Sequence, residues 1–416
     1  MTTTDSDRYD RPGRNEPIPL VIVQGFLGTN GAWMWGNFEQ YLNHASRVRR
    51  KTIFVSVGPV SSLHDRACEL YYALLGGTVD YGMEHSISHK HARYGRNIAQ
   101  GQYPDWSPTR PLHFLAHSMG GPTVIKLQDL IRQGHFGPTA QTPMILSINA
   151  ISAPFRGSGL VYLLGERADA APAVQPLSVG SILGKWVHVV SYLSPLVSHI
   201  IDFHGDSRSL TYRDISFFTL LQQLWRSDWA ESTDATPFDV TFQAADERES
   251  QGEGVVDAET FYQSHVAEMT RRHSQGSNFH APPYSQMISP LMYLYARLLG
   301  KFDYSTIRPR PSFLSEKPLS EEFWANDGAV PTFSQWHPLS CCHTLCRHLP
   351  VDNNEREAIP KPGVWYVKQE FDAHHMSLVP LWMGTDFQKQ WWKRLGWWLS
   401  AVDETLPYRQ ALYSGG

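Results

Sequence analysis

Long apolar runs and a basic surface are both missing from this sequence. Among its 416 residues, no uninterrupted apolar stretch reaches about eighteen residues, the length that a membrane-spanning helix needs. We therefore expect no transmembrane segment. Lys and Arg number 36 against 40 Asp and Glu, which gives a formal net charge of −4. Because no basic stripe is present to pair with phosphates, we expect no nucleic-acid partner.

Cysteine is scarce, with four residues in the whole chain. Cys68 stands alone, whereas Cys341, Cys342 and Cys346 lie close together in the sequence. This pattern is not that of a disulfide framework. The clustered cysteines could bind a metal together with His343, but we interpret the segment as a variable loop with free thiols.

The first residues, "MTTTDSDRYDRPGRNEP", are polar and lack the apolar centre of a secretory signal. We interpret residues 1–17 as a polar N-terminal tail. We expect the protein to be cytoplasmic or otherwise intracellular. The alternative is a secreted protein whose leader is missing from this sequence.

The apolar residues are arranged as in an α/β fold. Hydrophobic residues make up 42% of the chain and charged residues 18%, which allows a sizeable core. Short β-branched or apolar runs predict strands over 18–23, 51–57, 111–116, 143–151 and 363–368, and helical spacing predicts helices over 120–131 and 385–402, the second with Thr385 as its N-cap. Strands that alternate with helices favour parallel pairing, so we expect a mostly parallel central sheet flanked by helices.

The stretch "FLAHSMGGPTV" places Ser118 between a predicted strand and a predicted helix. Ala116 and Gly120 lie two positions on either side. This is the pattern of a nucleophile elbow with alanine in place of the first glycine, where a tight turn leaves no room for larger side chains. The alternative is a serine that caps a helix. The succession of strand, small residue, serine, glycine and helix favours the interpretation of Ser118 as a nucleophile.

An elbow serine also needs an oxyanion hole, an acid and a base. The N–H of Met119 and that of Phe26, in the glycine turn "QGFLG", are the candidate oxyanion donors. Asp327 lies in the glycine turn "FWANDGAVP", of the kind that follows a strand, and is the candidate acid. His374 and His375 follow the last predicted strand, where this arrangement keeps its base. Each of these residues could instead be a solvated loop residue, and their chain order favours the catalytic interpretation.

The segment "VGPVSSLHDRACELYYALLGGTVDYGMEHSISHKHARYGR", together with "AHSMGG", closely resembles the thermoalkalophilic bacterial lipases of the Geobacillus and staphylococcal group. The similarity is strong from about residue 18 to 159 and returns at "WAESTD", "WANDGAVP" and "HHMSLV". The resemblance implies an α/β-hydrolase domain over 18–410. It also implies a zinc-binding insertion over 60–105 and a second insertion over 155–250, which holds a lid and helical cap and contributes a zinc ligand.

The resemblance also implies the site residues. The catalytic triad becomes Ser118, Asp327 and His375, since the family's base aligns with His375. The family holds a structural zinc ion with two aspartates and two histidines, which match the following positions in this chain: Asp65, His85, His91 and Asp234. Imidazole nitrogens and carboxylate oxygens can close a tetrahedral zinc shell, and His89 is the rival ligand.

Two departures from the family's pattern stand out. Ser377 replaces a carboxylate that the family uses for calcium, and another calcium carboxylate falls near Trp382, so we do not expect calcium to bind. Gln24 replaces a histidine before the Gly-Phe pair. The oxyanion hole can survive this change because it uses the N–H of Phe26.

The apolar segment 178–203 matches the position of the family's lid, with one face marked by Trp186, Val190, Leu193, Val197 and Ile201. A buried core helix is the alternative. As a lid, the helix would cover an acyl pocket in water and turn toward a lipid surface when open.

We therefore expect a serine ester hydrolase, most simply a triacylglycerol lipase that acts on acylglycerols or other lipid esters during transient contact with a lipid surface. Three alternatives stay open. The first is an esterase or thioesterase for soluble short-chain substrates. The second is a catalytically weak, zinc-stabilised lipid-binding protein. The third is a metalloenzyme that uses the histidine cluster directly.

Overall fold

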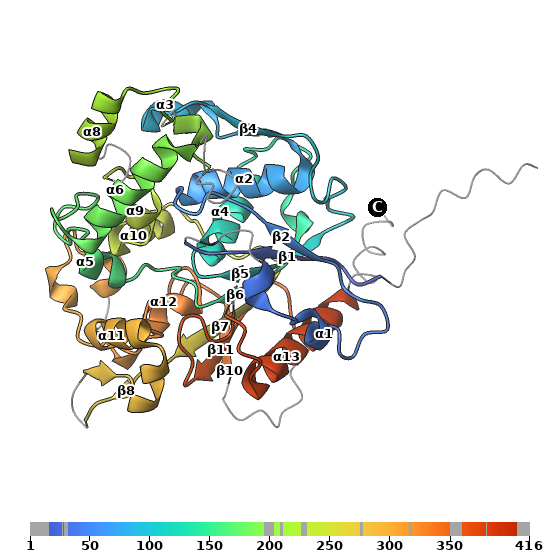
Figure 1. The fold of residues 1–416 in the computed structure, drawn as a ribbon. Helices are drawn as coiled ribbons and strands as arrows, with labels where there is room; N and C mark the ends of the chain where they lie inside the picture. The colour runs from blue at the N-terminus through green and yellow to red at the C-terminus, as the bar shows by residue number, and fades with distance from the viewer. Residues whose placement is uncertain are drawn as a thin grey trace, which may run out of the picture.

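A seven-stranded parallel sheet forms the centre of the protein (Figure 1). The computed structural model describes residues 16–26, 28, 32–194, 204–208, 211–225, 231–274, 278–315, 318–349, 360–379 and 381–405. The strand order is β10-β11-β7-β6-β5-β1-β2, and every paired strand in this sheet is parallel to its neighbour. The strands are β1 (Leu20–Val23), β2 (Thr52–Val55), β5 (Leu112–His117), β6 (Ile145–Ile151), β7 (Phe261–Glu268), β10 (Cys346–Leu349) and β11 (Trp365–Phe371).

All five predicted strands are confirmed, with ends that shift by a few residues. β5 and β6 are buried along their whole length, and most of their residues are apolar, although β5 carries His113 and His117 and β6 carries Ser147 and Asn149. β7 and β10 were not predicted. β7 is buried over most of its length but carries Gln263, Ser264 and His265, so neither an apolar run nor a clear alternation marks it in the sequence.

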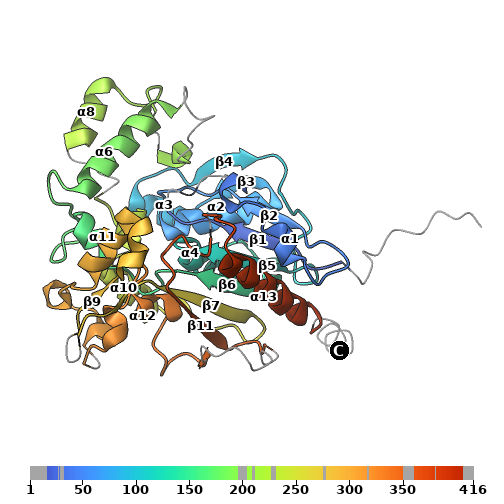
Figure 2. The ribbon, with the colours of Figure 1, turned by 60° about the horizontal axis from the view of Figure 1, so that its bottom comes forward.

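Helices cover both faces of the sheet (Figures 1 and 2). On one face lie α2 (Leu63–Leu75) and α4 (Gly120–Arg132), which pack with one set of strand side chains into the largest apolar core. On the other lie α1 (Glu39–Leu42) and α13 (Asp386–Asp403), with a second core. The predicted N-cap of the last helix is confirmed, because the Thr385 hydroxyl accepts a hydrogen bond from the N–H of Gln388.

Two long excursions leave this layered body. The first, after α2, contains an antiparallel pair, β3 (Gly77–Asp80) and β4 (Tyr94–Ile98), joined through α3 (Met83–His89). The second runs from β6 to β7 and contains α5 (Leu160–Leu164), α6 (Val179–Tyr192), α8 (Phe217–Trp225), α9 (Thr236–Asp239) and α10 (Phe242–Ser250). In both views α6 and α8 lie side by side, on the side of the molecule away from α13 (Figures 1 and 2).

The segment between β7 and β10 adds a third group of short elements around an aromatic cluster. They are β8 (Arg271–Arg272), β9 (His280–Ala281), α11 (Pro290–Leu299) and α12 (Thr332–Trp336), with short 3₁₀ turns at Tyr284–Ile288, Tyr304–Thr306, Ser312–Leu314 and Glu321–Phe323. Three further 3₁₀ turns lie at Ala32–Trp35, Thr142–Met144 and Gly205–Arg208. Among the helices described, none is both long and apolar enough to cross a bilayer.

The predicted helix over 178–203 is only partly within the described residues. Its first part forms α6, which ends at Tyr192. Residues 195–203, which include Val197 and Ile201 of the predicted face, lie outside the described residues.

Candidate functional site

Ser118 lies in a sharp turn between β5 and α4, with a φ of 54°. A non-glycine residue in this left-handed region is uncommon and is a recognised feature of active-site turns. The residues that pack against this turn must be small, because larger side chains would not fit. A Cβ added to Gly120 would lie 2.2 Å from the carbonyl oxygen of Val23, and one added to Gly25 would lie 2.6 Å from the Cβ of Ser118. Glycines at these positions let β1 and its following loop approach the serine closely.

His375 lies within hydrogen-bond distance of both Ser118 and Asp327. Its Nδ1–H donates to the Asp327 carboxylate at 2.8 Å. This leaves its Nε2 to accept from the Ser118 hydroxyl at 3.0 Å. The structure thus brings together the three predicted triad residues, and His374 takes no part in this chain of hydrogen bonds. A nucleophile, a base and an orienting acid in this order are the arrangement that activates a serine.

Asp327 is fully buried, and its loop is held in place by the backbone. Its Oδ1 accepts the N–H groups of Ala329 at 2.8 Å and Val330 at 2.7 Å, which leaves Oδ2 for His375. Asp327 lies in the predicted glycine turn, but the expectation of a post-strand loop is wrong, because a 3₁₀ turn precedes this loop. The loop instead packs against the end of β7, where the N–H of Met269 donates to the carbonyl of Asn326 at 3.0 Å.

His117 also supports the base, and the sequence reasoning did not assign it a role. Its Nε2 lies 2.9 Å from the backbone carbonyl of His375. Burial lowers the pKa of His117 to about 3, so the imidazole is neutral near pH 7, and its Nε2–H can donate to that carbonyl. This contact ties the end of β5 to the residue that carries the base. In the sequence, only its position directly before Ser118 could have indicated this role.

The two candidate oxyanion donors, Phe26 and Met119, line the same cavity as Ser118 and His375. The loop with Phe26 is fixed by Arg66, which lies fully buried on α2. Its guanidinium donates to the carbonyl of Gln24 at 2.5 Å and to the Thr123 hydroxyl in the first turn of α4 at 2.9 Å. Arg66 thus connects the two segments that carry the candidate donors, a role that the sequence did not reveal.

The cavity at Ser118 has a volume of about 400 Å³, which is in the range of small-molecule sites. Most of its lining is apolar and comes from both the sheet edge and the second excursion, including Met34, Val60, Leu160, Leu164, Leu183, Val187, Val240 and Val330. From α6 the lining residues are Gly180, Leu183, Gly184 and Val187. These differ from the predicted face: Trp186 and Leu193 are exposed, whereas Val190 packs beside Val60 and Val187.

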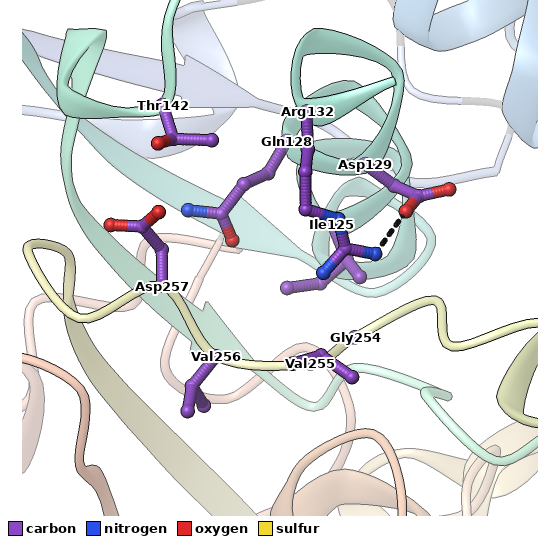
Figure 3. Close-up of a pocket in the computed structure, with 9 residues that line it drawn as sticks. All are labelled: Ile125, Gln128, Asp129, Arg132, Thr142, Gly254, Val255, Val256 and Asp257. Atoms are coloured by element: carbon purple, nitrogen blue, oxygen red, sulfur yellow. Dashed lines mark hydrogen bonds and ion pairs between the residues drawn. The ribbon is translucent and has the colours of Figure 1, made fainter.

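A second, much smaller cavity lies along α4, between Ile125, Gln128 and the segment before β7 (Figure 3). Its volume of about 40 Å³ suits about one water molecule. Arg132 reaches across it and forms an ion pair with Asp129 (Figure 3). None of its lining residues borders Ser118, so the chemistry belongs to the larger cavity.

The four predicted zinc ligands also lie together, at the side of the first excursion. Their candidate ligand atoms are all within 4.8 Å of one another, in the set Asp65, His85, His91 and Asp234. His85 Nε2 lies 3.2 Å from Asp65 and 3.3 Å from Asp234, and His91 Nε2 lies 3.6 Å from Asp234. Tetrahedral zinc with bonds of 2.0–2.1 Å separates such ligand atoms by about 3.4 Å. His89 is not a member of this cluster.

The side chains of this cluster are suited to binding a metal cation. The Nδ1 of His91 bonds to the carbonyl of Ala92 at 2.9 Å, and among the described residues its buried Nε2 has no hydrogen-bond partner. An orphaned nitrogen that faces a carboxylate is the arrangement expected of a metal ligand. Arg208, not predicted, donates to Oδ2 of both Asp65 and Asp234 and so connects the two carboxylates.

The loop after the base is held by side chains of this chain. Gln388 is buried on α13, donates to the carbonyls of Ser377 at 2.6 Å and Leu381 at 2.7 Å, and accepts the N–H of Met383 at 2.9 Å. The Ser377 hydroxyl accepts the N–H of His374 at 2.7 Å. A neutral amide and a hydroxyl thus hold this loop. The expectation that calcium does not bind stays a prediction.

Comparisons with known proteins show similarity to lipases. Residues 16–138 match a family described as "Lipase-like, C-terminal domain". The lipase of Staphylococcus hyicus is 28% identical over 373 residues, which cover 84% of this chain and 51% of that protein. The chain thus spans about half the length of the curated relatives it matches.

Solved structures extend the similarity to the fold. The crystal structure of Staphylococcus hyicus lipase superposes with a TM-score of 0.70 at 24% identity and covers 95% of this chain and 97% of that one. Lipase 1 from Pelosinus fermentans superposes with a TM-score of 0.65 at 25% identity, over 92% and 99% of the two chains. The resemblance to staphylococcal lipases found in the sequence is confirmed.

Proposed function

We propose that this chain is a carboxylic ester hydrolase, a triacylglycerol lipase that works through a Ser-His-Asp triad on an α/β-hydrolase domain. The observation that carries the proposal is the hydrogen-bonded chain Ser118–His375–Asp327 beside an apolar cavity of about 400 Å³. The similarity to staphylococcal lipases supports the same reaction.

In this mechanism His375 accepts the proton of the Ser118 hydroxyl as its oxygen attacks the ester carbonyl carbon. The N–H groups of Phe26 and Met119 stabilise the oxyanion that forms. His375 then gives the proton to the leaving alcohol, and an acyl-enzyme remains on Ser118. Water repeats the sequence and releases the fatty acid. Asp327 holds the imidazole in the required tautomer and stabilises its charged form.

The acyl chain would lie in the apolar cavity, under α6 as a lid. Two apolar stripes on the outside of the second excursion support contact with a lipid surface. On α6 the stripe consists of Val179, Ile182, Trp186 and Val189, and Leu193 continues it directly after the helix; on α8 it consists of Phe217, Phe218, Leu221 and Trp225. The α6 residues recur at helical spacing and are exposed, so the helix has one apolar face over the cavity and another toward solvent.

Zinc bound by Asp65, His85, His91 and Asp234 would have a structural role. Four protein ligands close the shell and leave no open position for chemistry. Such an ion would join the insertion over 60–105 to the segment 231–239 of the second insertion, and it would offset the charge of two buried carboxylates.

The main alternative is an esterase or thioesterase for soluble short-chain substrates. The apolar stripes on α6 and α8 favour lipid substrates, because a soluble ester gives no reason to expose them. A catalytically weak lipid-binding protein would have no need of the hydrogen bonds that join Ser118, His375 and Asp327.

The test is a fluorophosphonate probe followed by peptide mapping, with hydrolysis of p-nitrophenyl esters and emulsified triacylglycerol of increasing chain length. We expect the probe to label Ser118 alone. Ser118→Ala should lose labelling and at least about 10⁴-fold of kcat with its fold intact. Wild-type hydrolysis no faster than that of Ser118→Ala would refute the proposal, and activity confined to soluble short esters would favour the esterase.

A further inference from the structure

Another group of metal-ligand side chains shares no residue with the triad or with the Asp/His cluster. It occupies the loop that leads from α12 into β10, the strand at the end of the sheet (Figure 1). One atom from each of four side chains, His337, Cys341, Cys346 and His348, lies within 4.8 Å of all the others. The sequence interpretation of this segment as a loop with free thiols did not include either histidine.

The spacing of these atoms is that of a tetrahedral metal centre. Zinc bonds are about 2.3 Å to sulfur and 2.0–2.1 Å to nitrogen, so sulfur and nitrogen on one tetrahedral ion lie about 3.6 Å apart. The Sγ of Cys341 lies 3.6 Å from His337 Nε2 and 3.5 Å from His348 Nε2. A thiol has a single proton and can donate it to only one of two imidazoles. One metal ion explains both distances together.

The orientation of His337 also fits a ligand. This residue ends α12 and is buried, and its Nδ1–H donates to the carbonyl of Pro338 at 3.0 Å. That hydrogen bond fixes the tautomer in which the lone pair of Nε2 faces Cys341. Metal-bound histidines characteristically donate their other N–H to a carbonyl in this way.

The strand brings the other two ligands to the same place. Cys346 and His348 are two residues apart on β10, so their side chains leave the strand on the same side. The His348 ring packs edge-on against Trp336 of α12, with ring centres 4.8 Å apart. The neighbouring Cys342 and His343 are excluded, because both contact the Ser340 hydroxyl at 2.9 Å and neither belongs to the cluster.

We propose that His337, Cys341, Cys346 and His348 bind a structural zinc ion, separate from the site at Asp65, His85, His91 and Asp234. Two thiolates, two neutral imidazoles and Zn²⁺ sum to zero charge, at a site where His337 is buried, Cys346 is partly buried and the other two ligands are exposed. Sulfur and imidazole ligands select zinc over calcium or magnesium. With four protein ligands, the ion has no open position for substrate.

The proposed ion would connect the strand at the edge of the sheet to α12, which packs against the loop that holds Asp327. It joins β10, a four-residue strand at the sheet edge, to α12. On α12, Gln335 donates to the carbonyls of Ala267 on β7 and Val330 beside Asp327, both at 3.0 Å. A metal at the end of α12 would therefore stabilise both the edge strand and the segment that holds Asp327.

Cobalt spectroscopy on the full chain tests this proposal independently of any activity. Metal is removed under reducing conditions, and Co²⁺ is added to the wild type and to Cys341→Ser/Cys346→Ser. Only a thiolate ligand produces a strong sulfur-to-cobalt charge-transfer band. The Asp/His cluster contains no sulfur, but Cys68 lies in a third group with His64 and His135. The double variant retains Cys68, so loss of the band in that variant assigns it to Cys341 and Cys346. We expect the band in the wild type and its loss in the double variant.

The matched control is Cys342→Ser, which removes an adjacent exposed thiol outside the cluster and should keep the band. Zinc content of the protein purified without chelators should fall by about one equivalent in the double variant and stay unchanged in the control. If the double variant does not fold, the wild-type cobalt spectrum and His348→Gln decide the question. A wild-type spectrum without the band, or a disulfide between Cys341 and Cys346 found by thiol counting, would overturn the proposal.

Discussion

At the scale of single residues, the site depends on short backbone contacts that admit few substitutions. The loop after β1 approaches Ser118 through Gly25, and the first turn of α4 approaches Val23 through Gly120. In both places a Cβ would collide with atoms that cannot move without shifting the elbow. The positive φ of Ser118 is maintained by this close packing, which supplies the free energy that the strained conformation costs.

At this scale we predict that His117 positions the catalytic base, His375. His117→Leu removes the donor to the His375 carbonyl, whereas His117→Gln retains an N–H. We expect His117→Leu to lower kcat about tenfold with little change in KM, because a hydrogen bond of about 1.4 kcal/mol no longer orients the base. His117→Gln should recover part of the loss.

Steady-state kinetics on a soluble p-nitrophenyl ester measure this effect, and circular dichroism checks the fold of each variant. If both variants keep the wild-type kcat, His117 only fills space in the core. If KM rises while kcat is constant, the residue acts on substrate binding instead.

At the scale of elements, α6 of the second excursion has two apolar faces: one lines the cavity at Ser118 and the other is exposed on the surface. This arrangement predicts that Ile182→Asp on α6 and Phe218→Asp on α8 impair hydrolysis of emulsified triacylglycerol by at least about tenfold. The physical reason is that each change removes roughly 1.5–3 kcal/mol of apolar contact with the lipid surface. Hydrolysis of a soluble short ester should change less than about twofold.

Trp397→Asp is the matched control, because Trp397 is an exposed aromatic residue on α13, away from α6 and α8 (Figure 2). It should leave both activities near the wild-type level. Equal losses on the two substrates for Ile182→Asp would count against the lid, and so would equal sensitivity of the control.

A second prediction at this scale concerns the proposed zinc ion in the first excursion. His85→Ala should lose about one equivalent of zinc and lower the apparent Tm by at least about 5 °C, since binding free energy of a structural metal adds to folding. His89→Ala, on the same helix but outside the cluster, should keep both. Metal analysis and differential scanning fluorimetry measure these changes.

Treatment of the wild type with a chelator separates a structural metal from a catalytic one. For a structural ion, thermal stability falls first, and activity at low temperature persists until the protein unfolds. Immediate loss of hydrolysis at unchanged Tm would instead support a metalloenzyme.

At the scale of the whole molecule, buried neutral histidines set the response to acid. Burial lowers the pKa of His113, His117 and His265, and that of His117 falls to about 3. His265 Nδ1 lies 2.9 Å from the indole nitrogen of Trp391 and 3.2 Å from Glu370 Oε1. All three rings lie in the central sheet, so their protonation would oppose folding of the whole domain.

These shifts predict that stability falls on acidification below about pH 6.5. Between the folded and unfolded pKa values the unfolded chain binds more protons, so the free energy of unfolding rises with pH in this window. Each histidine contributes up to about 1.4 kcal/mol per pH unit. Burial raises the pKa of Glu166 to about 8 and that of Glu268 to about 7, and these two groups oppose part of the change in the same range. Urea unfolding from pH 7.5 to 5 measures the slope. Constant stability over this range would contradict the prediction.

The sequence by itself determined the parts of this protein that depend on local sterics and local hydrogen bonds. Ala116, Ser118 and Gly120 identify the elbow because a tight turn restricts side-chain size wherever it occurs. Buried parallel strands such as β5 and β6 are recognisable as mostly apolar segments, and Thr385 as a helix cap, for the same local reason.

Only the tertiary structure decided which distant side chains meet. Arg208 on the two aspartates, His117 on the carbonyl of His375, and His337 beside Cys341 and His348 have no signature in spacing, because each contact depends on how separate elements pack. Asp327 illustrates both cases. Its glycine turn marked it as a candidate, but the packing of its loop against β7 is what brings its carboxylate to His375. Local preferences act over a few residues, whereas the free energy that joins these groups comes from burial of the whole core.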